Sequence, residues 1–359
     1  MRVLIVDDSV TFRSAIKAAL LDLPGVEVGG VAANGKIAIA KLKNEVFDVV
    51  ILDLEMPELD GIGTLTAIRD EGLTVTTLLF AAPTEAAYAK IRQALSLGAA
   101  DFLAKPVTTE VGNIEAAVAK IRAELAPRVL ALGARLGSSP KATPLPVSPA
   151  PSPPARVTSW PKIDLTALRP QAVVLASSTG GPMALERVFL QLKQPPRRPL
   201  LICQHMPSPF TKSLAKHLQE LSGIPVAEGE NGEEVRAGRV YLAPADWHMR
   251  LVKVGGTVRI ELREGPRINY VIPAADPLFE TAADVYGASL AAFVLTGMGE
   301  DGKLGAIRIK EKGGAVVVQD RASSIVWGMP GAVVEAGAYD KIAPLDECAA
   351  TLKHLIEQV

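Results

Sequence analysis

The sequence contains little cysteine, no long apolar run and almost no net charge, and each absence excludes a class of protein. Cys203 and Cys348 are the only cysteines, too few for a disulfide framework, which fits a reducing compartment. No apolar run approaches the ~18 residues of a membrane span, and the acidic residues in MRVLIVDDS come too early for a secretory signal. The 38 basic and 39 acidic side chains give a formal net charge of −1, which offers no overall field to nucleic acid or an anionic membrane. We therefore expect a cytoplasmic protein with no nucleic-acid partner and no membrane insertion.

Proline, by contrast, is abundant and unevenly distributed. Ten of the 27 prolines lie between Leu125 and Pro170, most densely in PLPVSPAPSPP at 144–154. Proline fixes φ and lacks a backbone donor, so this stretch is not expected to form a regular helix or a central strand. Its Ser, Ala and Thr neighbours give it little to bury, which is typical of an extended, semi-rigid spacer. A ligand for a proline-recognition domain is the alternative interpretation.

Charge divides the chain at the same place. Residues 1–124 have a net charge of −5, residues 125–169 of +5 and residues 170–359 of −1. A length of 359 residues also favours two domains over one. The sequence therefore predicts an acidic N-terminal domain at 1–124, a basic, Pro-rich linker at 125–169 and a C-terminal domain at 170–359.

The N-terminal domain alternates short apolar runs with stretches of helical spacing. We expect buried strands at 2–6, 26–32, 49–53, 75–80 and 100–104. Helical spacing follows each of them, at 10–20, 35–44, 61–70, 84–97 and 108–122. Five such units predict an α/β fold with a doubly wound parallel sheet, in which ligands bind beyond the carboxyl ends of the strands.

Charged residues gather at those strand ends. Asp7 and Asp8 follow the first strand, Asp53 ends the third, and Lys105 follows the fifth. Three carboxylates in one crevice repel one another, and a hard divalent cation such as Mg²⁺ relieves that repulsion. An ammonium group beside them neutralises the oxygens of an incoming phosphoryl group. The pattern therefore indicates an aspartate that accepts phosphate, with solvated acidic loops as the alternative.

Short motifs accompany these charged groups: Met-Pro at 56–57, Asp-Gly at 60–61 and Pro106 after Lys105. With them, residues 1–124 resemble a two-component receiver domain. The resemblance implies a flavodoxin-like fold with a five-stranded parallel sheet and phosphorylation of Asp53 by a histidine kinase. It also implies Mg²⁺ held by Asp8, Asp53 and the backbone carbonyl of Glu55, with Lys105 supporting the phosphoryl group.

One position departs from the receiver pattern. The fourth strand of receivers usually ends in Ser or Thr, whose hydroxyl binds the phosphoryl oxygen, and the corresponding residue here is Ala81. Thr84 is the nearest hydroxyl, beyond Pro83, whereas Phe102 matches the family's switch aromatic. We expect Asp53 to accept phosphate, but with reduced coupling to the output domain.

After Pro170 the alternation of apolar runs and helical spacing resumes. The runs expected as strands are 172–176, 199–204, 289–296 and 315–319, with shorter strands between 239 and 263. One helix is expected to follow SSTGGP and to end at about Leu192, and another is expected between the strands at 289–296 and 315–319. Further helices are expected at 211–221, 277–287 and 345–357. The pattern predicts a second doubly wound, mostly parallel α/β domain.

Three polar residues follow three of these strands: Ser178 in SSTGGP, His205 in QHMP and Asp301 in GMGEDG. The carboxyl ends of parallel strands share one edge, so the three side chains are expected to meet there. A serine becomes a nucleophile when a base takes its proton, and a histidine base needs an acid that fixes its tautomer. Gly180 and Gly181 let the backbone approach a substrate, and the next helix offers N–H groups to an oxyanion. Together the motifs predict serine catalysis. Alone, STGG is also typical of a phosphate-binding turn, a histidine of a structural role and GMGEDG of a glycine-rich turn.

Other histidines and carboxylates are weaker candidates. His217 lies within an expected helix and His354 near the C-terminus, whereas His248 follows a Pro-Ala-Asp-Trp turn and is a candidate for the cleft wall. Asp246 and Asp276 are alternative acids, but neither follows a long apolar strand.

Residues 170–359 resemble the catalytic domain of chemotaxis protein-glutamate methylesterases of the CheB type. The matching stretches occur in the family's order: SSTGGP (177–182), QHMP (204–207), YLAP with His248 (241–248), DPLFETAA (276–283), TGMGEDG (296–302) and WGMP (327–330). The resemblance implies that Ser178 is the nucleophile, His205 the base and Asp301 the acid that orients it. Thr179 and the backbone N–H of Met298 would lie near the oxyanion.

The family's usual Gly-Ala before the nucleophile is Ala176-Ser177 here, which places a second hydroxyl beside Ser178. The Thr-Gly-Gly that follows favours Ser178. The order of receiver, linker and esterase also matches the family, and implies that the receiver covers the esterase cleft until Asp53 is phosphorylated.

The implied substrates are glutamyl methyl esters on the cytoplasmic domains of methylated chemoreceptors, and the family also deamidates certain receptor glutamines. The implied cofactors are Mg²⁺ for the receiver and none for the esterase. Two other functions stay open: a phosphorylation-controlled docking protein with an inert esterase-like domain, and a receiver-linked hydrolase of a small-molecule ester. The intact Ser178, His205 and Asp301 argue against the first, and the lack of an obvious lid segment against the second.

Overall fold

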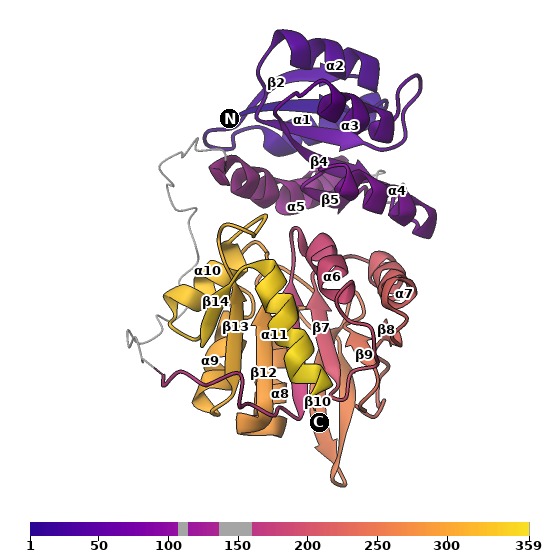
Figure 1. Cartoon of the computed structure of the whole chain (residues 1–359). Coiled ribbons are helices and arrows are strands. Elements are labelled where there is room, and N and C mark those ends of the chain that lie inside the picture. Colours follow the sequence, from indigo (N-terminus) through magenta and orange to yellow (C-terminus); the bar gives the residue numbers. More distant parts are fainter. Residues whose placement is uncertain (107–113, 136–159, 359) are drawn as a thin grey trace. The chain divides into compact units, whose positions relative to one another are not determined.

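A computed structural model of the chain describes residues 1–106, 114–135 and 160–358, and divides into two compact units, Met1–Ala155 and Arg156–Val359 (Figure 1). The proline-dense run at 144–154 lies outside the described residues. Among those that are described, no helix combines the length and the apolar character needed to cross a membrane. Each unit is built around its own parallel sheet, so the predicted α/β class is confirmed.

The N-terminal unit contains a five-stranded parallel sheet in the order β2-β1-β3-β4-β5. Its strands are β1 (Arg2–Val6), β2 (Glu27–Ala32), β3 (Val49–Asp53), β4 (Thr76–Ala81) and β5 (Asp101–Ala104). Its helices are α1 (Val10–Leu20), α2 (Gly35–Asn44), α3 (Gly61–Asp70), α4 (Glu85–Ser96) and α5 (Ile114–Arg135). Side chains of Ser9, Asn34, Asp60 and Thr84 accept hydrogen bonds from the first turns of α1 to α4. These capping residues fix where each helix begins, and therefore where each loop leaves the sheet edge.

Helix α5 is longer than the sequence indicates. A helix was expected at 108–122 and a linker from 125, but α5 continues to Arg135 with Pro127 inside it. Leu125, Val129 and Leu132 follow helical spacing and are fully buried, and α5 packs against α1. Their burial outweighs the ~3 kcal/mol that an interior proline costs a helix. The first part of the predicted linker is thus helical.

The other end of the predicted linker packs against the C-terminal unit. Trp160 lies against its core, and the backbone N–H of Ile163 donates to Asp340 Oδ1 at 2.8 Å. Asp340 also forms a buried ion pair with Lys310. The segment from Trp160 onward is therefore held by hydrogen bonds and packing as a part of this unit.

The C-terminal unit contains a seven-stranded sheet in the order β14-β13-β12-β6-β7-β9-β8, with every neighbouring pair parallel. Its strands are β6 (Ala172–Ser177), β7 (Leu200–Gln204), β8 (Val226–Glu228), β9 (Val240–Leu242), β12 (Leu290–Val294), β13 (Ala315–Gln319) and β14 (Lys341–Ala343). The helices are α6 (Gly181–Phe189), α7 (Phe210–Ser222), α8 (Ala275–Tyr286), α9 (Lys303–Glu311), α10 (Gly328–Glu335) and α11 (Leu345–Glu357). Strands β8 and β14 and helix α10 were not anticipated from the sequence.

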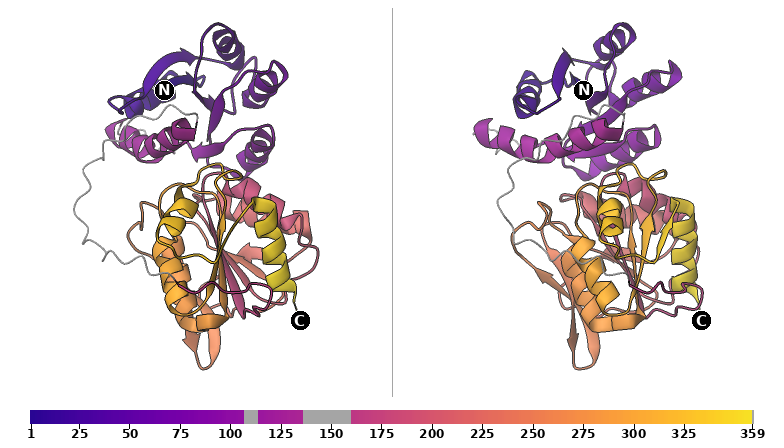
Figure 2. Two further views of the ribbon diagram at one scale, coloured as in Figure 1. Left: turned by 60° about the vertical axis from the view of Figure 1, so that its left-hand side comes forward. Right: turned by 90° about the vertical axis from the view of Figure 1, so that its left-hand side faces the viewer.

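Helices cover both faces of this sheet, with α6, α7 and α11 on one and α8, α9 and α10 on the other (Figure 2). The central strands β6, β7, β12 and β13 are accordingly buried throughout. The strand order reverses between β6 and β12, which makes the carboxyl ends of these two strands a topological switch point. A separate antiparallel hairpin, β10 (His248–Val254) and β11 (Thr257–Arg263), begins and ends near that edge.

Candidate active site

Ser178 lies on a sharp turn between β6 and α6. Its carbonyl accepts a hydrogen bond from Gly181 N–H at 2.7 Å, so the chain reverses within three residues of the strand end. Gly180 has a φ of 76°, which an L side chain rarely adopts. A Cβ on Gly181 would lie 2.0 Å from Gln204 Oε1. The two glycines are therefore required for a turn that brings Ser178 to the edge of the sheet.

The two neighbouring serines have different surroundings. Ser177 is fully buried, and its hydroxyl donates to Gln204 Oε1 at 2.6 Å. The amide nitrogen of Gln204 donates in turn to the carbonyls of Ser178 and His205. Ser178 Oγ has no hydrogen-bond partner in the described part of the chain. The hydroxyl of Ser177 thus links β6 to β7 through a hydrogen bond, whereas the hydroxyl of Ser178 is free to act as a nucleophile.

His205 follows β7, and one nitrogen of its ring is held by Asp301. The distance from His205 Nε2 to Asp301 Oδ2 is 2.7 Å, with both side chains buried. His205 Nδ1 is also buried and has no partner among the residues that the structure describes. With Nε2 protonated toward the carboxylate, Nδ1 carries the lone pair that can take a proton.

The carboxylate of Asp301 sits at the N-terminus of α8. Its Oδ2 accepts the backbone N–H of Ala275 at 2.5 Å, and its Oδ1 that of Asp276 at 3.2 Å. The helix has no side-chain cap of its own. Burial by itself raises the pKa of Asp301, but the hydrogen bond and charge of His205, with the two backbone donors, hold that pKa below its ordinary value. Asp301 is therefore an ionised acid that fixes the tautomer of His205.

Two hydrogen-bond donors, from the residue after Ser178 and from the loop after β12, are free of partners within the described residues. The backbone N–H of Met298 makes no hydrogen bond within the described residues, and Thr179 Oγ1 is buried without a partner there. Both belong to loops that leave the same edge as Ser178, since Ser178 N–H donates to the carbonyl of Thr296 at 3.0 Å. These donors suit a site that stabilises negative charge on a carbonyl oxygen.

A second cluster of functional groups lies in the N-terminal unit. Carboxylate oxygens of Asp7, Asp8 and Asp53 lie within 4.8 Å of one another. Lys105 Nζ is 2.9 Å from Asp7 Oδ2 and 2.7 Å from Asp53 Oδ2. Burial raises the pKa of Asp53 to about 6, with Lys105 opposing the shift and Asp7 adding to it. Clustered carboxylate oxygens are the donor set that Mg²⁺ prefers, so these residues fit that ion.

Ala81 lies beside this cluster and supplies no hydroxyl to it. It ends β4, is fully buried, and its carbonyl accepts the N–H of Lys105 at 2.7 Å. The nearest hydroxyl, that of Thr84, accepts the N–H of Ala87 at 3.1 Å as the cap of α4. Phe102 is buried on β5. Glu55 donates its N–H to Asp53 Oδ1 at 3.2 Å and directs its side chain to Lys90.

Comparison with known proteins identifies both units. A family model described as CheB methylesterase matches residues 173–352, and one described as response regulator receiver domain matches residues 3–118. The protein-glutamate methylesterase/protein-glutamine glutaminase of Trichodesmium erythraeum is 40% identical over 97% of this chain and 97% of its own length. The chain belongs to the CheB methylesterase family. The protein-glutamate methylesterase/protein-glutamine glutaminase 2 of Caulobacter vibrioides is also 40% identical to the chain, over 97% of this chain and 96% of its own length.

A solved structure supports the same assignment for the C-terminal unit. The CheB methylesterase catalytic domain of Thermotoga maritima is 41% identical, with a TM-score of 0.50, over 52% of this chain and 99% of that one. The expectation of a receiver joined to a methylesterase-type enzyme is therefore confirmed at the level of family and fold.

Three of the weaker candidates from the sequence analysis, His217, Asp246 and His248, make no hydrogen bond to the candidate triad within the described residues. His217 pairs with Glu186 at 2.8 Å, and Asp246 is exposed. His248 accepts the N–H of Ala274 on Nδ1 at 3.3 Å, and its Nε2 lies 3.0 Å from the carbonyl of Pro266. Both of its nitrogens are used, so His248 connects the loop at 264–274 to the start of β10.

Asp276 and Asn269 contact the candidate triad, although Asp276 was only an alternative acid in the sequence analysis and Asn269 was not singled out. Asn269 Nδ2 lies 3.2 Å from Asp276 Oδ2 and 3.3 Å from Asp301 Oδ1. Burial and the charge of Asp301 raise the pKa of Asp276 to about 7, while the N–H of Gly305 opposes the shift. The DPLFETAA stretch was the one available signal for Asp276, and none of the matching stretches contains Asn269.

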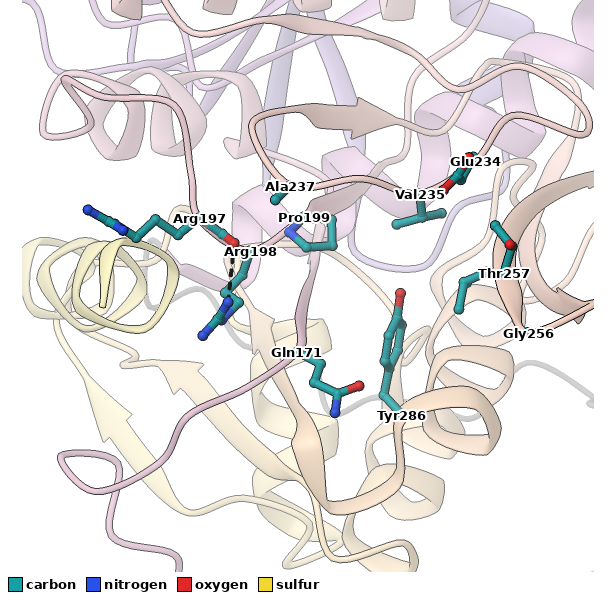
Figure 3. A pocket seen from close by; sticks show the side chains of 11 residues that line it. Gln171, Arg197, Arg198, Pro199, Glu234, Val235, Ala237, Gly256, Thr257 and Tyr286 are labelled. Atoms are coloured by element: carbon teal, nitrogen blue, oxygen red, sulfur yellow. Dashed lines mark hydrogen bonds between the residues drawn. The ribbon is translucent and has the colours of Figure 1, made fainter. Parts of the chain in front are cut away.

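A hollow of about 410 Å³ lies at the opposite edge of the same sheet (Figure 3). Gln171 precedes β6, Pro199 precedes β7, and Thr257 stands at the turn of the β10–β11 hairpin. Figure 3 shows the ring of Tyr286 between Gln171 and Thr257. This hollow lies at the amino ends of the strands and contains none of the predicted site residues, so it is not the candidate active site.

Proposed function

We propose that the chain is a phosphorylation-regulated serine esterase that hydrolyses glutamyl methyl esters on the cytoplasmic domains of chemoreceptors. The observation that carries the proposal is the ring of His205. Asp301 holds Nε2 at 2.7 Å, and Nδ1 is buried, with no partner among the described residues, at the sheet edge where Ser178 lies. The family names support the substrate class, because two relatives of nearly the same length are named for that reaction.

In the proposed mechanism, Ser178 Oγ attacks the carbonyl carbon of the ester as its proton passes to His205 Nδ1. Asp301 stays ionised and stabilises the imidazolium that forms. The Met298 N–H and the Thr179 hydroxyl receive the negative charge on the carbonyl oxygen. His205 then gives the proton from Ser178 to the methoxide oxygen as the bond from the carbonyl carbon to that oxygen breaks, so methanol leaves and the acyl group stays on Ser178.

A water molecule next gives a proton to His205 and attacks the acyl-serine. His205 passes this proton to Ser178 Oγ as the bond to the acyl carbon breaks, and the glutamic acid released ionises to its carboxylate. A glutamine side chain can follow the same two steps with ammonia as the leaving group. We propose this deamidation as a second activity of the same residues, and no cofactor is needed for either reaction.

We further propose that a histidine kinase phosphorylates Asp53 and thereby controls the activity of Ser178. Asp8 and Asp53, with the carbonyl of Glu55, would hold Mg²⁺, which supplies charge neutralisation for the phosphoryl group when bound. Lys105 is placed to contact the same oxygens, at 2.7 Å from Asp53. The proposed partners, a histidine kinase and the cytoplasmic domains of receptors, support a cytoplasmic location.

Release of methanol from a methylated receptor fragment, with and without acetyl phosphate, tests catalysis and regulation together. We expect hydrolysis by the full chain that increases with the phosphodonor, and none by the Ser178→Ala variant. Failure of the full chain to release methanol in either condition would favour the rival function, a docking protein with an inert esterase-like domain.

A further inference from the structure

Two aromatic side chains are exposed in the C-terminal unit. The chain has 8 Phe, 5 Tyr and 3 Trp, all of them among the described residues. Of this set, only Tyr270 and Trp247 are exposed: 88% of the surface of Tyr270 is open to solvent, and 37% of that of Trp247. Large exposed aromatics are typical of sites that bind another protein, because each ring provides much apolar area with few torsions to order.

Tyr270 is displayed on a tight two-residue turn. Ile268 and Val271 pair through two backbone hydrogen bonds of 3.1 and 3.0 Å, and the residues between them, Asn269 and Tyr270, have φ angles of 50° and 67°. In such a turn asparagine is favoured first and glycine second. A tyrosine in the second position is strained, and this kind of strain is found mostly at functional sites.

The turn is fastened to the candidate active site. Asn269 donates to Asp301 Oδ1 at 3.3 Å, so Tyr270 is one residue from a direct contact of the catalytic acid. His248 binds Pro266 and Ala274, on either side of the turn. Trp247 directly precedes His248 and follows β9, whose carboxyl end lies at the same edge as that of β7. Both exposed aromatics therefore belong to loops at the edge that carries Ser178 and His205.

We propose that Tyr270, assisted by Trp247, is a substrate-contact residue that packs on the apolar surface of a receptor helix next to the glutamyl ester. The inference rests on the proposed function. A methyl ester offers few atoms for recognition, so most of the affinity must come from the ~10–12 Å wide helix that bears it. A ring fixed by a rigid turn loses little freedom when it packs on that helix.

The test compares KM and kcat for a methylated receptor cytoplasmic fragment. Tyr270→Ala should raise KM about tenfold with kcat within about twofold, as expected for a contact residue at the centre of an interface. Tyr270→Phe keeps the ring and should retain the KM of the unmodified chain. Val254→Ala, at the far end of the β10–β11 hairpin and 57% exposed, is the matched control.

Binding separates this inference from the proposed function. In the Ser178→Ala background, Tyr270→Ala should weaken binding of the receptor fragment about tenfold, whether or not the unmodified chain releases methanol. Tyr270→Gly removes the ring and the strained backbone together, so binding should weaken while the thermal midpoint does not fall. An unchanged KM and affinity in Tyr270→Ala, or a lower thermal midpoint in Tyr270→Gly, would overturn the assignment.

Discussion

Asp301 Oδ2 accepts two hydrogen bonds at once, from His205 Nε2 at 2.7 Å and from the backbone N–H of Ala275 at 2.5 Å. The first orients the proposed base, and the second places the carboxylate on the N-terminus of α8. The N-terminus of α8 therefore stabilises the negative charge of the Asp301 carboxylate, and the same carboxylate fixes the tautomer of His205. The arrangement ties the proposed catalytic acid to the fold of the unit.

The two adjacent serines should differ sharply in their effect on activity. Ser178→Ala should lower the rate of methanol release by about 10³-fold or more, because no nucleophile remains. Ser177→Ala should retain activity and lose about 1–2 kcal/mol of stability, since Gln204 Oε1 loses its buried donor. The measurements are methanol release and urea unfolding of both variants. Loss of activity in Ser177→Ala with intact folding, or an active Ser178→Ala, would contradict the assignment.

Asp276 should make stability depend on pH. Burial and the charge of Asp301 raise its pKa from 3.8 to about 7, so the folded chain binds more protons than the unfolded chain between these values. The free energy of unfolding therefore falls as pH rises through this range. Asp276→Asn removes the titrating carboxyl group. The thermal midpoint of this variant minus that of the unmodified chain should therefore increase from pH 5 to pH 8.

The exposed Asp246 provides the control for that series. Asp246→Asn removes a carboxylate of the same unit that is not buried, and so controls for the change in net charge. A difference for Asp276→Asn that stays constant over this pH range would show that Asp276 does not titrate there.

A hydroxyl at position 81 should strengthen the response to phosphorylation. Ala81 is buried beside Lys105, whose N–H its carbonyl accepts. Ala81→Ser supplies the donor that receivers usually place there, so the ratio of methanol release with and without acetyl phosphate should rise by about fivefold or more. Ala82→Ser, one residue further and partly exposed, should leave the ratio unchanged. Equal ratios in both variants would contradict a coupling role for this position.

Asp53 should be the residue that takes up phosphate in these experiments. Acetyl phosphate should label the unmodified chain and Ala81→Ser, whereas Asp53→Asn should lose the label, because an amide is not a nucleophile. Equal labelling of Asp53→Asn would place the phosphoryl group elsewhere.

The ion pair of Lys310 and Asp340 should be important for the stability of the C-terminal unit. Both side chains are buried, with Nζ 2.6 Å from Oδ1. Lys310→Met leaves the carboxylate without its charged partner, which should cost about 3 kcal/mol. All three tryptophans, Trp160, Trp247 and Trp327, belong to this unit, so their fluorescence in urea reports its unfolding alone.

An exposed ion pair offers the comparison. Arg187 and Asp346 pair with more than half of each side chain open to solvent. Arg187→Met should therefore cost less than about 1 kcal/mol. If Lys310→Met lost no more free energy of unfolding than Arg187→Met, the buried pair would contribute no more to stability than a surface pair.

Local sequence patterns were sufficient for much of the fold. The five strands and first four helices of the N-terminal unit lie within a residue or two of the predicted ranges. Each of them has a clear apolar period, and each of the four helices also begins at a capping residue. Helix α5 was predicted too short, since Pro127 was read as a helix breaker. Whether Leu125 and Val129 are buried depends on α1, which is distant in sequence.

The candidate site divides in the same way. The sequence by itself determined which chemical groups follow which strands, and parallel strands bring Ser178, His205 and Asp301 to one edge. Only the tertiary structure decided that His205 presents Nε2 to Asp301, that Ser177 is held by Gln204, and that Asn269 and α8 support the acid. Periodicity along a chain encodes secondary structure and burial, whereas a hydrogen bond between residues far apart in sequence depends on how whole elements pack.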